Sequence, residues 1–533
     1  MEFIPYLVTI VAVLAFFQLQ RKWKSRNQIP KSKLPYPPEA AGGLPIIGHL
    51  LSFNTKSSVA RNLAAMAEKY GPVFALRIGM TPALVVSNWE SVKDCFTISD
   101  KALSSRPESI FAETLCFGNA SFAFAPYGPY WREIRKIVFL DLLSTRGLEK
   151  VRHVRVSEVD NTMKEVFSIF SKANNVGGKS STASPAKVEL RKLFEKFTLN
   201  LIVKKVSGMR YSETEVGTNK DAQFQKVFKA LVHYAGQFVL SDMIPIPFLK
   251  WLDIGGHIKS MKGFTKELDA VVQDLWDEHT QRRMNSETID EKGFMDVLLS
   301  KIQSESVFGY SRETAIKATI MTLIVGGFET TSTHLTWLMS LLLNHPHVMK
   351  KAQEEIDRHI GKDRWVEESD IKSLAYIQAI SKETLRLYPP PISVPRRAIE
   401  DCTVGGYLIP KNTLLFVNVW KLHRDPRVWS EPDKFLPERF LNSCNGPRKM
   451  HDDGYSLDYA FTPFGSGRRS CPGMLMATQV IYLIVARLLQ GFEFTTPSNL
   501  PVDMTEGLGT RLCKTTPLEV LIKPRLPNHA LYG

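Results

Sequence analysis

The sequence predicts a mainly α-helical protein with a minor β portion, organised as one large domain behind an N-terminal transmembrane helix. Three observations support this fold class. Many segments along the chain have helical periodicity, whereas alternating β-like runs are short and few. No interior stretch marks the end of one core and the start of another, and a hydrophobic fraction of 44% suffices for a large core. An apolar segment opens the chain.

Residues 1–20 are predicted to be a retained membrane anchor. Phe3–Leu19 is apolar except at Pro5, Thr9 and Gln18, and about 17 residues is the lower limit for crossing a bilayer. The basic cluster that follows predicts a single-pass protein of the endoplasmic reticulum membrane with its main body in the cytosol. A cleaved signal peptide is the alternative, but no small-x-small site follows and the charge lies on the wrong flank. The cluster comprises Arg21, Lys22, Lys24, Arg26, Lys31 and Lys33.

Residues 21–48 are predicted to form a basic, proline-rich hinge, and residues 49–533 the catalytic domain. The sequence Pro35-Tyr36-Pro37-Pro38 favours a stiff, extended backbone, which suits a segment that sets the angle of the body against the membrane. A plain surface linker is the alternative interpretation.

Cysteine usage and charge exclude several classes of protein. The six cysteines lie far apart without a CxxC or CxxCH motif, which excludes the usual zinc spacing and c-type haem attachment and fits a reducing compartment. A net charge of +14 would suit nucleic acid, but no nucleic-acid-binding motif accompanies it, so none is expected as a partner. A lipid bilayer or an acidic redox protein fits the charge better. The cysteines are Cys95, Cys116, Cys402, Cys444, Cys471 and Cys513.

Periodicity assigns the elements of the body. Helices are predicted over Ser57–Tyr70, Pro129–Leu143, Phe264–Met284, Ser311–Asn344 and Gln378–Tyr388. Strands are predicted over Val73–Arg77, Ala83–Ser87, Thr403–Ile409 and Leu414–Val419.

The segment Phe464–Gly473 (FGSGRRSCPG) is the strongest motif in the chain. Gly465 and Gly467 permit a tight turn beside a flat ligand. Pro472 favours the first position of a new helix that continues through Met474–Gln490.

Cys471 would then lie at the positive end of this helix, which favours the thiolate over the thiol. Arg469 can reach an anionic group beside it. A cysteine is more often a small buried hydrophobe, but the aromatic, glycine and arginine residues at fixed offsets weigh against that interpretation here.

The helix predicted over Ser311–Asn344 contains the second motif, residues 326–331 (GGFETT). Ser311 is a plausible N-cap, and Pro346 ends the helical run. Two glycines inside a helix cost on the order of 1 kcal/mol each, which the close approach of a flat ligand could compensate. The hydroxyl of Thr330 can bond the carbonyl of Gly326 and loosen the helix locally.

Two weaker patterns accompany these motifs. Glu383 and Arg386 stand three apart on one helical face, and Pro437–Phe440 (PERF) follows later. Trp131 and Arg135 form an i, i+4 pair. Alone, the first pattern is commonly a solvated helix pair and the second ordinary surface packing.

The two strong motifs resemble those of the cytochrome P-450 superfamily. Phe464, Gly467, Arg469, Cys471 and Gly473 match its haem signature F-x-x-G-x-R-x-C-x-G, and the resemblance extends over essentially the whole body. It implies a single cytochrome P-450 fold domain in which Cys471 ligates the iron of haem b and Arg469 pairs with a propionate. Strong thiolate donation favours cleavage of the O–O bond in such enzymes.

The resemblance also assigns roles to the other motifs. The segment 326–331 matches (A/G)-G-x-(D/E)-T-(T/S), which implies that Glu329 and Thr330 deliver protons during oxygen activation. Ordinary hydrogen-bond partners for these two side chains are the alternative. Glu383, Arg386 and Arg439 are implied to form a structural cluster around the ligand loop.

Further contacts with the propionates are implied for Trp131, Arg135 and Arg396, the last standing where many plant relatives carry histidine. As a permanent cation, Arg396 could bind a propionate at least as well.

An aromatic substrate pocket is expected over the haem, suited to flat or polycyclic apolar substrates. The alternative is that most of its phenylalanines are simply core. The residues expected to line it, together with Phe122, are Phe111, Phe117, Phe124, Phe328, Ile392, Val394 and Leu508.

Within the superfamily the chain resembles a plant branch of specialised metabolism that includes nicotine demethylase, protopine hydroxylase and flavone, coumarin and terpenoid hydroxylases. The implied activity is insertion of one atom of molecular oxygen into a small apolar substrate, with electrons from an NADPH-dependent flavoprotein reductase. A haem-thiolate isomerase or dehydratase acting on a peroxide, or a non-catalytic haem or lipid binder, is the alternative. A basic face that docks the reductase is a further hypothesis, with a solvated face as its alternative; it comprises Arg132, Arg135, Lys136, Arg448, Lys449 and Arg468.

Overall fold

The computed structural model describes most of the predicted body. The described residues are 34–53, 56–175, 184–208, 219–237, 239–244, 247–284, 293–390, 394–441, 459–509 and 512–532. The predicted anchor and the basic part of the predicted hinge, together with Ile392, Cys444, Arg448 and Lys449, lie outside these ranges.

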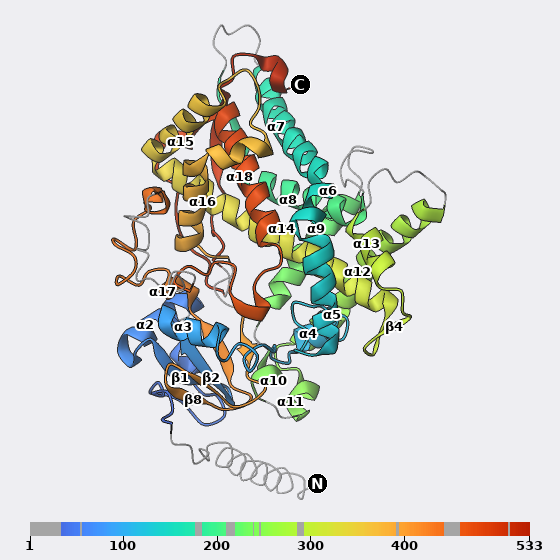
Figure 1. Ribbon diagram of the computed structural model, residues 1–533, viewed down its shortest axis with the longest axis vertical. Helices are drawn as coiled ribbons and strands as arrows, with labels where there is room; N and C mark the ends of the chain where they lie inside the picture. Colours follow the sequence, from blue (N-terminus) through green and yellow to red (C-terminus); the bar gives the residue numbers. More distant parts are fainter. Residues whose placement is uncertain are drawn as a thin grey trace, which may run out of the picture.

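Helices form most of the molecule, and the strands are short and form separate small sheets (Figure 1), which confirms the predicted mainly α fold with a minor β portion. The helices are α2 (Val59–Tyr70), α3 (Trp89–Phe96), α4 (Ile110–Leu115), α5 (Pro129–Ile137), α6 (Thr145–Lys150), α7 (Arg152–Asn175), α8 (Leu190–Ser207), α9 (Asn219–Ala235), α10 (Leu240–Met243), α11 (Pro247–Leu252), α12 (His257–Met284), α13 (Phe294–Lys301), α14 (Arg312–Asn344), α15 (Pro346–His359), α16 (Ala375–Leu387), α17 (Val419–Leu422) and α18 (Met474–Gly491).

The strands form small sheets. The largest has the order β1 (Val73–Ile78), β2 (Thr81–Val86), β9 (Leu414–Val417) and β6 (Arg396–Arg397), with β2 and β9 parallel. A second has the order β10 (Phe492–Thr495), β11 (Glu519–Pro524) and β3 (Ala186–Glu189). Two hairpins pair β4 (Ser306–Val307) with β5 (Tyr310–Ser311) and β7 (Cys402–Val404) with β8 (Tyr407–Ile409).

The largest sheet is buried on both faces because alternate side chains of its strands point to opposite sides. Val73 and Leu84 pack with Val92 of α3, whereas Phe74 and Val85 pack with the apolar face of α2. The sheet is therefore held between helices.

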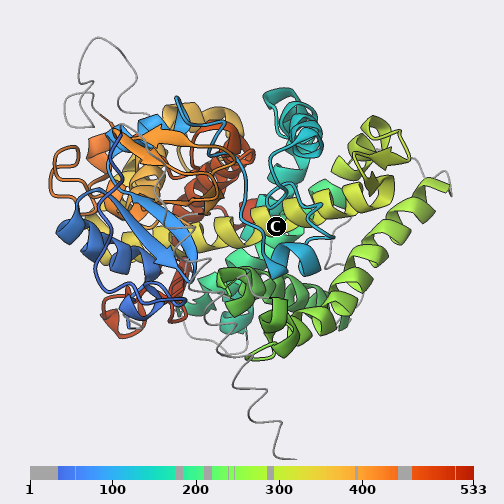
Figure 2. The same cartoon turned by 90° about the horizontal axis from the view of Figure 1, so that it is seen from below.

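The long helix α14 is the axis of the fold. Its N-cap is Ser311, whose hydroxyl accepts from the backbone N–H of Thr314 at 3.1 Å, and it ends just before Pro346, as the sequence predicts. Figure 2 shows this helix in yellow, crossing the middle of the molecule between the blue strands and the green helices. The motif 326–331 lies near the middle of its length.

Two predicted elements are corrected. The helix expected over Pro129–Leu143 leaves α-helical geometry after Ile137 and continues as a π-helical turn, Val138–Leu142. The strand expected over Thr403–Ile409 is a hairpin, because Gly405 and Gly406 have positive φ angles and reverse the chain.

The proline-rich stretch after Leu34, part of the predicted hinge, contacts β1 and β8. The backbone N–H of Ala40 donates to the carbonyl of Ala75, and the N–H of Leu408 donates to the carbonyl of Pro35, both at 2.9 Å. Among the described residues, α18 is the one helix long and apolar enough to cross a bilayer, but two thirds of its span is buried inside the protein, as in a core helix.

Candidate active site

One large cavity of about 670 Å³ lies between α14 and the loop that precedes α18. Side chains of α5, α8 and α9, the strand β9 and the segments around residues 106–124 and 394–396 complete its wall. Both strong sequence motifs face this cavity, although about 140 residues separate them along the chain. The fold therefore brings them together at one site.

The loop of the first motif makes the tight turn that its glycines predict. Gly465 has φ +68° and Gly467 has φ +67°, a left-handed conformation that residues with a Cβ rarely adopt. The backbone N–H of Cys471 then donates to the carbonyl of Phe464 at 2.9 Å and closes the loop. The following helix begins at Met474 with Gly473 as N-cap, so Pro472 precedes the helix rather than occupying its first position.

Cys471 faces the cavity, which accounts for its accessible surface. Burial by the surrounding protein raises the pKa of its thiol, whereas the backbone N–H of Gly473 and the charge of Arg135 lower the pKa. A bound metal ion would reverse this balance, because a coordinating thiol is deprotonated.

On the opposite wall, α14 presents Gly326, Glu329 and Thr330 to the cavity. The hydroxyl of Thr330 donates to the carbonyl of Gly326 at 2.7 Å, as the sequence predicts. Near Glu329, the thiol of Cys513 donates to one carboxylate oxygen at 3.8 Å. Cys513 was not predicted to contact the motif, because it lies in the distant C-terminal segment and no local pattern connects the two.

Four arginines line the same cavity. Arg135 donates to the backbone carbonyl of Ser470, and Arg396 donates to the carbonyl of Ser466 at 2.6 Å. Arg469 donates to the carbonyls of Ser104, Phe122 and Ala125 and lies over the ring of Trp131, 4.3 Å from its centroid. The fourth, Arg106, was not predicted from the sequence; it donates to the carbonyls of Ala123, Val394 and Pro395 at 2.9 Å.

The cluster carries excess buried positive charge. Burial and the neighbouring guanidinium groups lower the pKa of Arg469 to about 8, that of Arg106 to about 9 and that of Arg396 to about 10. Asp100 pairs with Arg396 at 3.3 Å, whereas Arg106, Arg135 and Arg469 have no carboxylate salt-bridge partner in the described part of the chain. A bound dianion beside Cys471 would balance this charge, and the two propionates of haem b fit that requirement.

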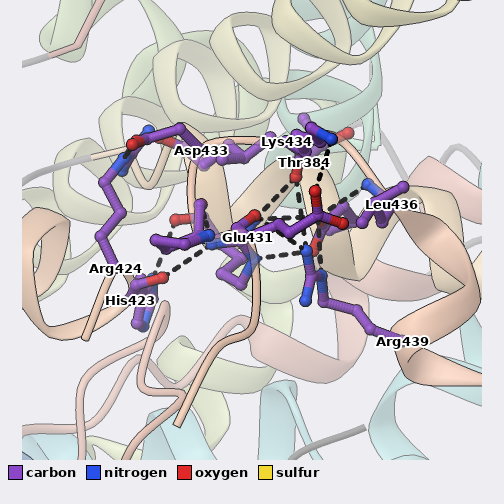
Figure 3. A network of polar contacts seen from close by, with 12 residues as sticks. Thr384, His423, Arg424, Glu431, Asp433, Lys434, Leu436 and Arg439 are labelled. Carbon is purple, nitrogen blue, oxygen red and sulfur yellow. Dashed lines mark hydrogen bonds and ion pairs between the residues drawn. The ribbon is translucent and has the colours of Figure 1, made fainter. Parts of the chain in front are cut away.

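Glu383, Arg386 and Arg439 lie together in the core, each at most 4% exposed. The carboxylate of Glu383 accepts two bonds from Arg386, at 2.7 and 2.9 Å, and one from Arg439 at 3.0 Å. It also accepts from the backbone N–H of Leu436 at 2.9 Å. Figure 3 shows Arg439 and Leu436 reaching this network from the segment that also carries Glu431 and Lys434. The network thus links α16 to the segment of residues 434–439.

The aromatic residues in the wall of the cavity differ in part from those that the sequence predicts. Phe111 and Phe124 line it in edge-to-face contact, with ring centroids 5.1 Å apart, and Phe122 and Val394 line it as well.

Three residues expected in the pocket do not line the cavity. Phe328 is fully buried because it lies about 200° around α14 from Gly326 and faces the core. Phe117 packs against the core at a turn with φ +53°, and Leu508 is exposed at the surface. Ile392 lies outside the described residues.

A cavity between a cysteine-bearing loop and a helical acid–hydroxyl pair, with a cluster of cations for an anionic cofactor, defines a haem-thiolate enzyme. The chain belongs to the cytochrome P450 family, whose model it matches over residues 37–522. The cytochrome P450 of zebrafish in complex with progesterone has the same fold, with a TM-score of 0.70 and 27% identity over 87% of this chain and 99% of that chain.

Similar proteins of full length come from plants. The chain is 47% identical to vinorine hydroxylase of Rauvolfia serpentina over 100% of both chains. It is 44% identical to nicotine N-demethylase of Nicotiana tomentosiformis over 98% of both, and 43% identical to strychnine-10-hydroxylase of Strychnos nux-vomica over 98% of this chain and 97% of that one. The chain is a haem-thiolate monooxygenase that carries haem b, and the peroxide isomerase alternative is not favoured.

Proposed function

We propose that this enzyme hydroxylates or oxidatively demethylates an apolar, polycyclic plant metabolite, using molecular oxygen and electrons that an NADPH-dependent flavoprotein reductase supplies. The observation that carries the proposal is the convergence of Cys471, Glu329, Thr330 and the arginine cluster on one cavity. The aromatic rings and the apolar side chains of α8 and α9 in its wall suit a flat substrate. Relatives named for oxidation of vinorine, nicotine, strychnine and flavonoids support an alkaloid or flavonoid as the substrate class.

In this proposal Cys471 is the ligand of the haem iron. Arg135, Arg396 and Arg469 hold the propionates, with Trp131 supporting Arg469 from beneath its guanidinium plane. Phe464 and Gly473 shape the loop and leave space beside the sulfur. Bound haem b supplies the redox chemistry by which molecular oxygen is reduced and one oxygen atom enters the substrate.

Glu329 and Thr330 deliver protons at the oxygen-binding side of the cavity. The hydroxyl of Thr330 already donates its own proton to the carbonyl of Gly326, so its lone pairs are free to accept from water or from a protonated oxygen. Glu329 lies one residue before it and can exchange protons with solvent through bound water.

Changing Thr330 to alanine is expected to leave haem content unchanged while product formed per NADPH consumed falls by about 100-fold, because the hydroxyl that accepts from and positions the proton-carrying water is lost. Electrons should then appear as hydrogen peroxide or superoxide, measured alongside NADPH oxidation. Thr330→Ser, which keeps a hydroxyl, is the matched control and should retain most of the coupling. Full coupling in the alanine variant would refute the role in proton delivery.

The reaction class is tested with microsomes of cells that express the chain. A panel of alkaloids and flavonoids is incubated with and without NADPH, and oxygenated products are sought. Product that depends on NADPH and oxygen supports the proposal. Turnover of an organic peroxide without NADPH, together with no oxygenated product when NADPH is present, would instead support the isomerase alternative.

We further propose that the catalytic domain lies on the cytosolic face of the endoplasmic reticulum membrane, held by residues 1–20. Phe248, Trp251 and Ile254 around α11 are 58%, 78% and 56% exposed. They lie at the same end of the molecule as the first described residues of the chain (Figure 1). Exposed apolar side chains beside the chain's point of attachment suit contact with a lipid surface.

Docking of the reductase is proposed on the exposed cations of α5. Arg132 and Lys136 are exposed, while Arg135 between them reaches the ligand loop at Ser470. Arg468, in the same loop, is half-exposed and paired with Asp100. An acidic partner on this face would approach the haem from the side of Cys471.

Reversing the charge of Arg132 and Lys136 together is expected to raise the reductase concentration needed for half-maximal turnover by about tenfold at low salt, with the difference shrinking as ionic strength rises. Lys266→Glu, on the exposed surface of α12, is the control and should change little. Unchanged kinetics in the double variant would show that these cations are a solvated face and do not dock the reductase.

A further inference from the structure

A carboxylate that no motif predicts lies in the wall of the active-site cavity. Asp242 is on the short helix α10, close to α11 and α4 (Figure 1). One of its oxygens accepts from the backbone N–H of Ile110, the first residue of α4, at 2.8 Å. The helix is held in place because the N–H of Met80 donates to the carbonyl of Met243 at 3.1 Å. The position of the carboxylate is therefore fixed by both neighbouring elements.

The surroundings of Asp242 are largely apolar. Close to Asp242, the cavity is lined by Phe111, Val239 and Met243. Burial raises the pKa of the Asp242 carboxyl to about 6. Two charged groups face it from the neighbouring helices, Lys250 of α11, which lowers this pKa, and Glu113 of α4, which raises it.

Neither neighbour neutralises Asp242. Lys250 and Glu113 form their own salt bridge at 3.2 Å, and both are more than half exposed. The arginines of the cavity donate to backbone carbonyls and to Asp100. In the described part of the chain Asp242 has no salt-bridge partner, and it lines the cavity that the substrate would occupy.

We propose that Asp242 binds the protonated nitrogen of an amine substrate and so selects basic nitrogen compounds over neutral ones of the same shape. This inference rests on the function proposed above and narrows it to amines. A carboxylate in an apolar wall costs free energy that a bound cation offsets, whereas a neutral ligand leaves that cost in place. Both partners are ionised between the carboxyl pKa of about 6 and the amine's own pKa, which includes the pH of the cytosol.

The test uses two probes of equal shape and the full-length holoprotein. N,N-dimethyl-(2-naphthyl)methylamine carries a protonated tertiary nitrogen, and 2-isobutylnaphthalene is its neutral carbon isostere. Binding of each is followed by the change in the haem spectrum at pH 7.5. A thiolate-type carbon monoxide spectrum is recorded first for every variant, so failure of the haem-thiolate assignment is recognised separately.

Asp242→Asn is the decisive variant, since the amide oxygen can still accept from the N–H of Ile110 while the charge is lost. Amine affinity should fall by about 10- to 100-fold, and affinity for the isostere should stay the same or rise. Asp242→Glu should keep most of the preference. Glu108→Gln, which removes an exposed cavity-rim acid paired with Arg397, should change neither affinity.

The wild type should also bind the amine about fourfold more weakly at pH 5.5 than at pH 7.5, and the asparagine variant should not show this dependence. If Asp242→Asn lowered the affinity for both probes equally, the role of Asp242 would be structural alone. If the variant kept its affinity for both probes, the charge of Asp242 would not face the ligand. Both results overturn the proposal.

Discussion

Replacing Cys471 with serine is expected to abolish monooxygenation, with turnover falling by at least about 1,000-fold, or ~4 kcal/mol in activation free energy. An alcohol oxygen is a far weaker electron donor than a thiolate, and thiolate donation favours cleavage of the O–O bond. The measurements are product formation with saturating reductase and the spectrum of the reduced carbon monoxide complex. The serine variant should lose the thiolate-type spectrum even where it still binds haem.

The matched control is Cys402→Ser. Cys402 is a partly exposed cysteine on β7 that does not line the cavity, so this variant should keep both spectrum and turnover. Haem content determined independently separates loss of the ligand from loss of the cofactor. A serine variant at position 471 that kept the thiolate-type spectrum would place the iron ligand elsewhere in the chain.

The second large effect is expected at Glu383. Its alanine variant leaves Arg386 and Arg439 buried without their carboxylate, and breaking a buried ion pair from one side costs about 3–5 kcal/mol. Against a total stability of roughly 5–15 kcal/mol, this loss should leave little folded holoprotein at 37 °C. The measurements are the yield of soluble haem protein and its thermal unfolding.

Two further variants serve as controls for this prediction. Glu354→Gln breaks an exposed pair with Lys350 on α15 and should cost at most about 1 kcal/mol. Glu383→Gln keeps the shape and hydrogen-bond acceptor while removing the charge. Its loss of unfolding free energy should therefore lie between that of Glu354→Gln and that of Glu383→Ala. Normal stability of Glu383→Ala would show that water solvates the two arginines and that the cluster does not hold the fold.

The sequence alone predicted those features of the protein that depend on interactions between residues close together in the chain. The period of apolar residues gave α14 with its Ser311 cap, and the glycines at 465 and 467 predicted the left-handed turn that the loop adopts. The hydrogen bond from Thr330 to Gly326 spans one helical turn, so spacing was sufficient to predict it. Five residues at fixed offsets, Cys471 among them, were enough to indicate the family.

Only the tertiary structure decided which distant side chains share the cavity. Arg106, Asp242 and Cys513 lie on segments with no motif, and their contacts join residues more than a hundred positions apart. Phe117 and Leu508 failed as pocket residues because the direction of a side chain depends on how its segment packs, which composition does not encode, whereas the helical period alone turns Phe328 away from Gly326. Local bonding is determined by neighbours in sequence, whereas the charge and shape of the cavity come from chain segments that meet only when the protein folds.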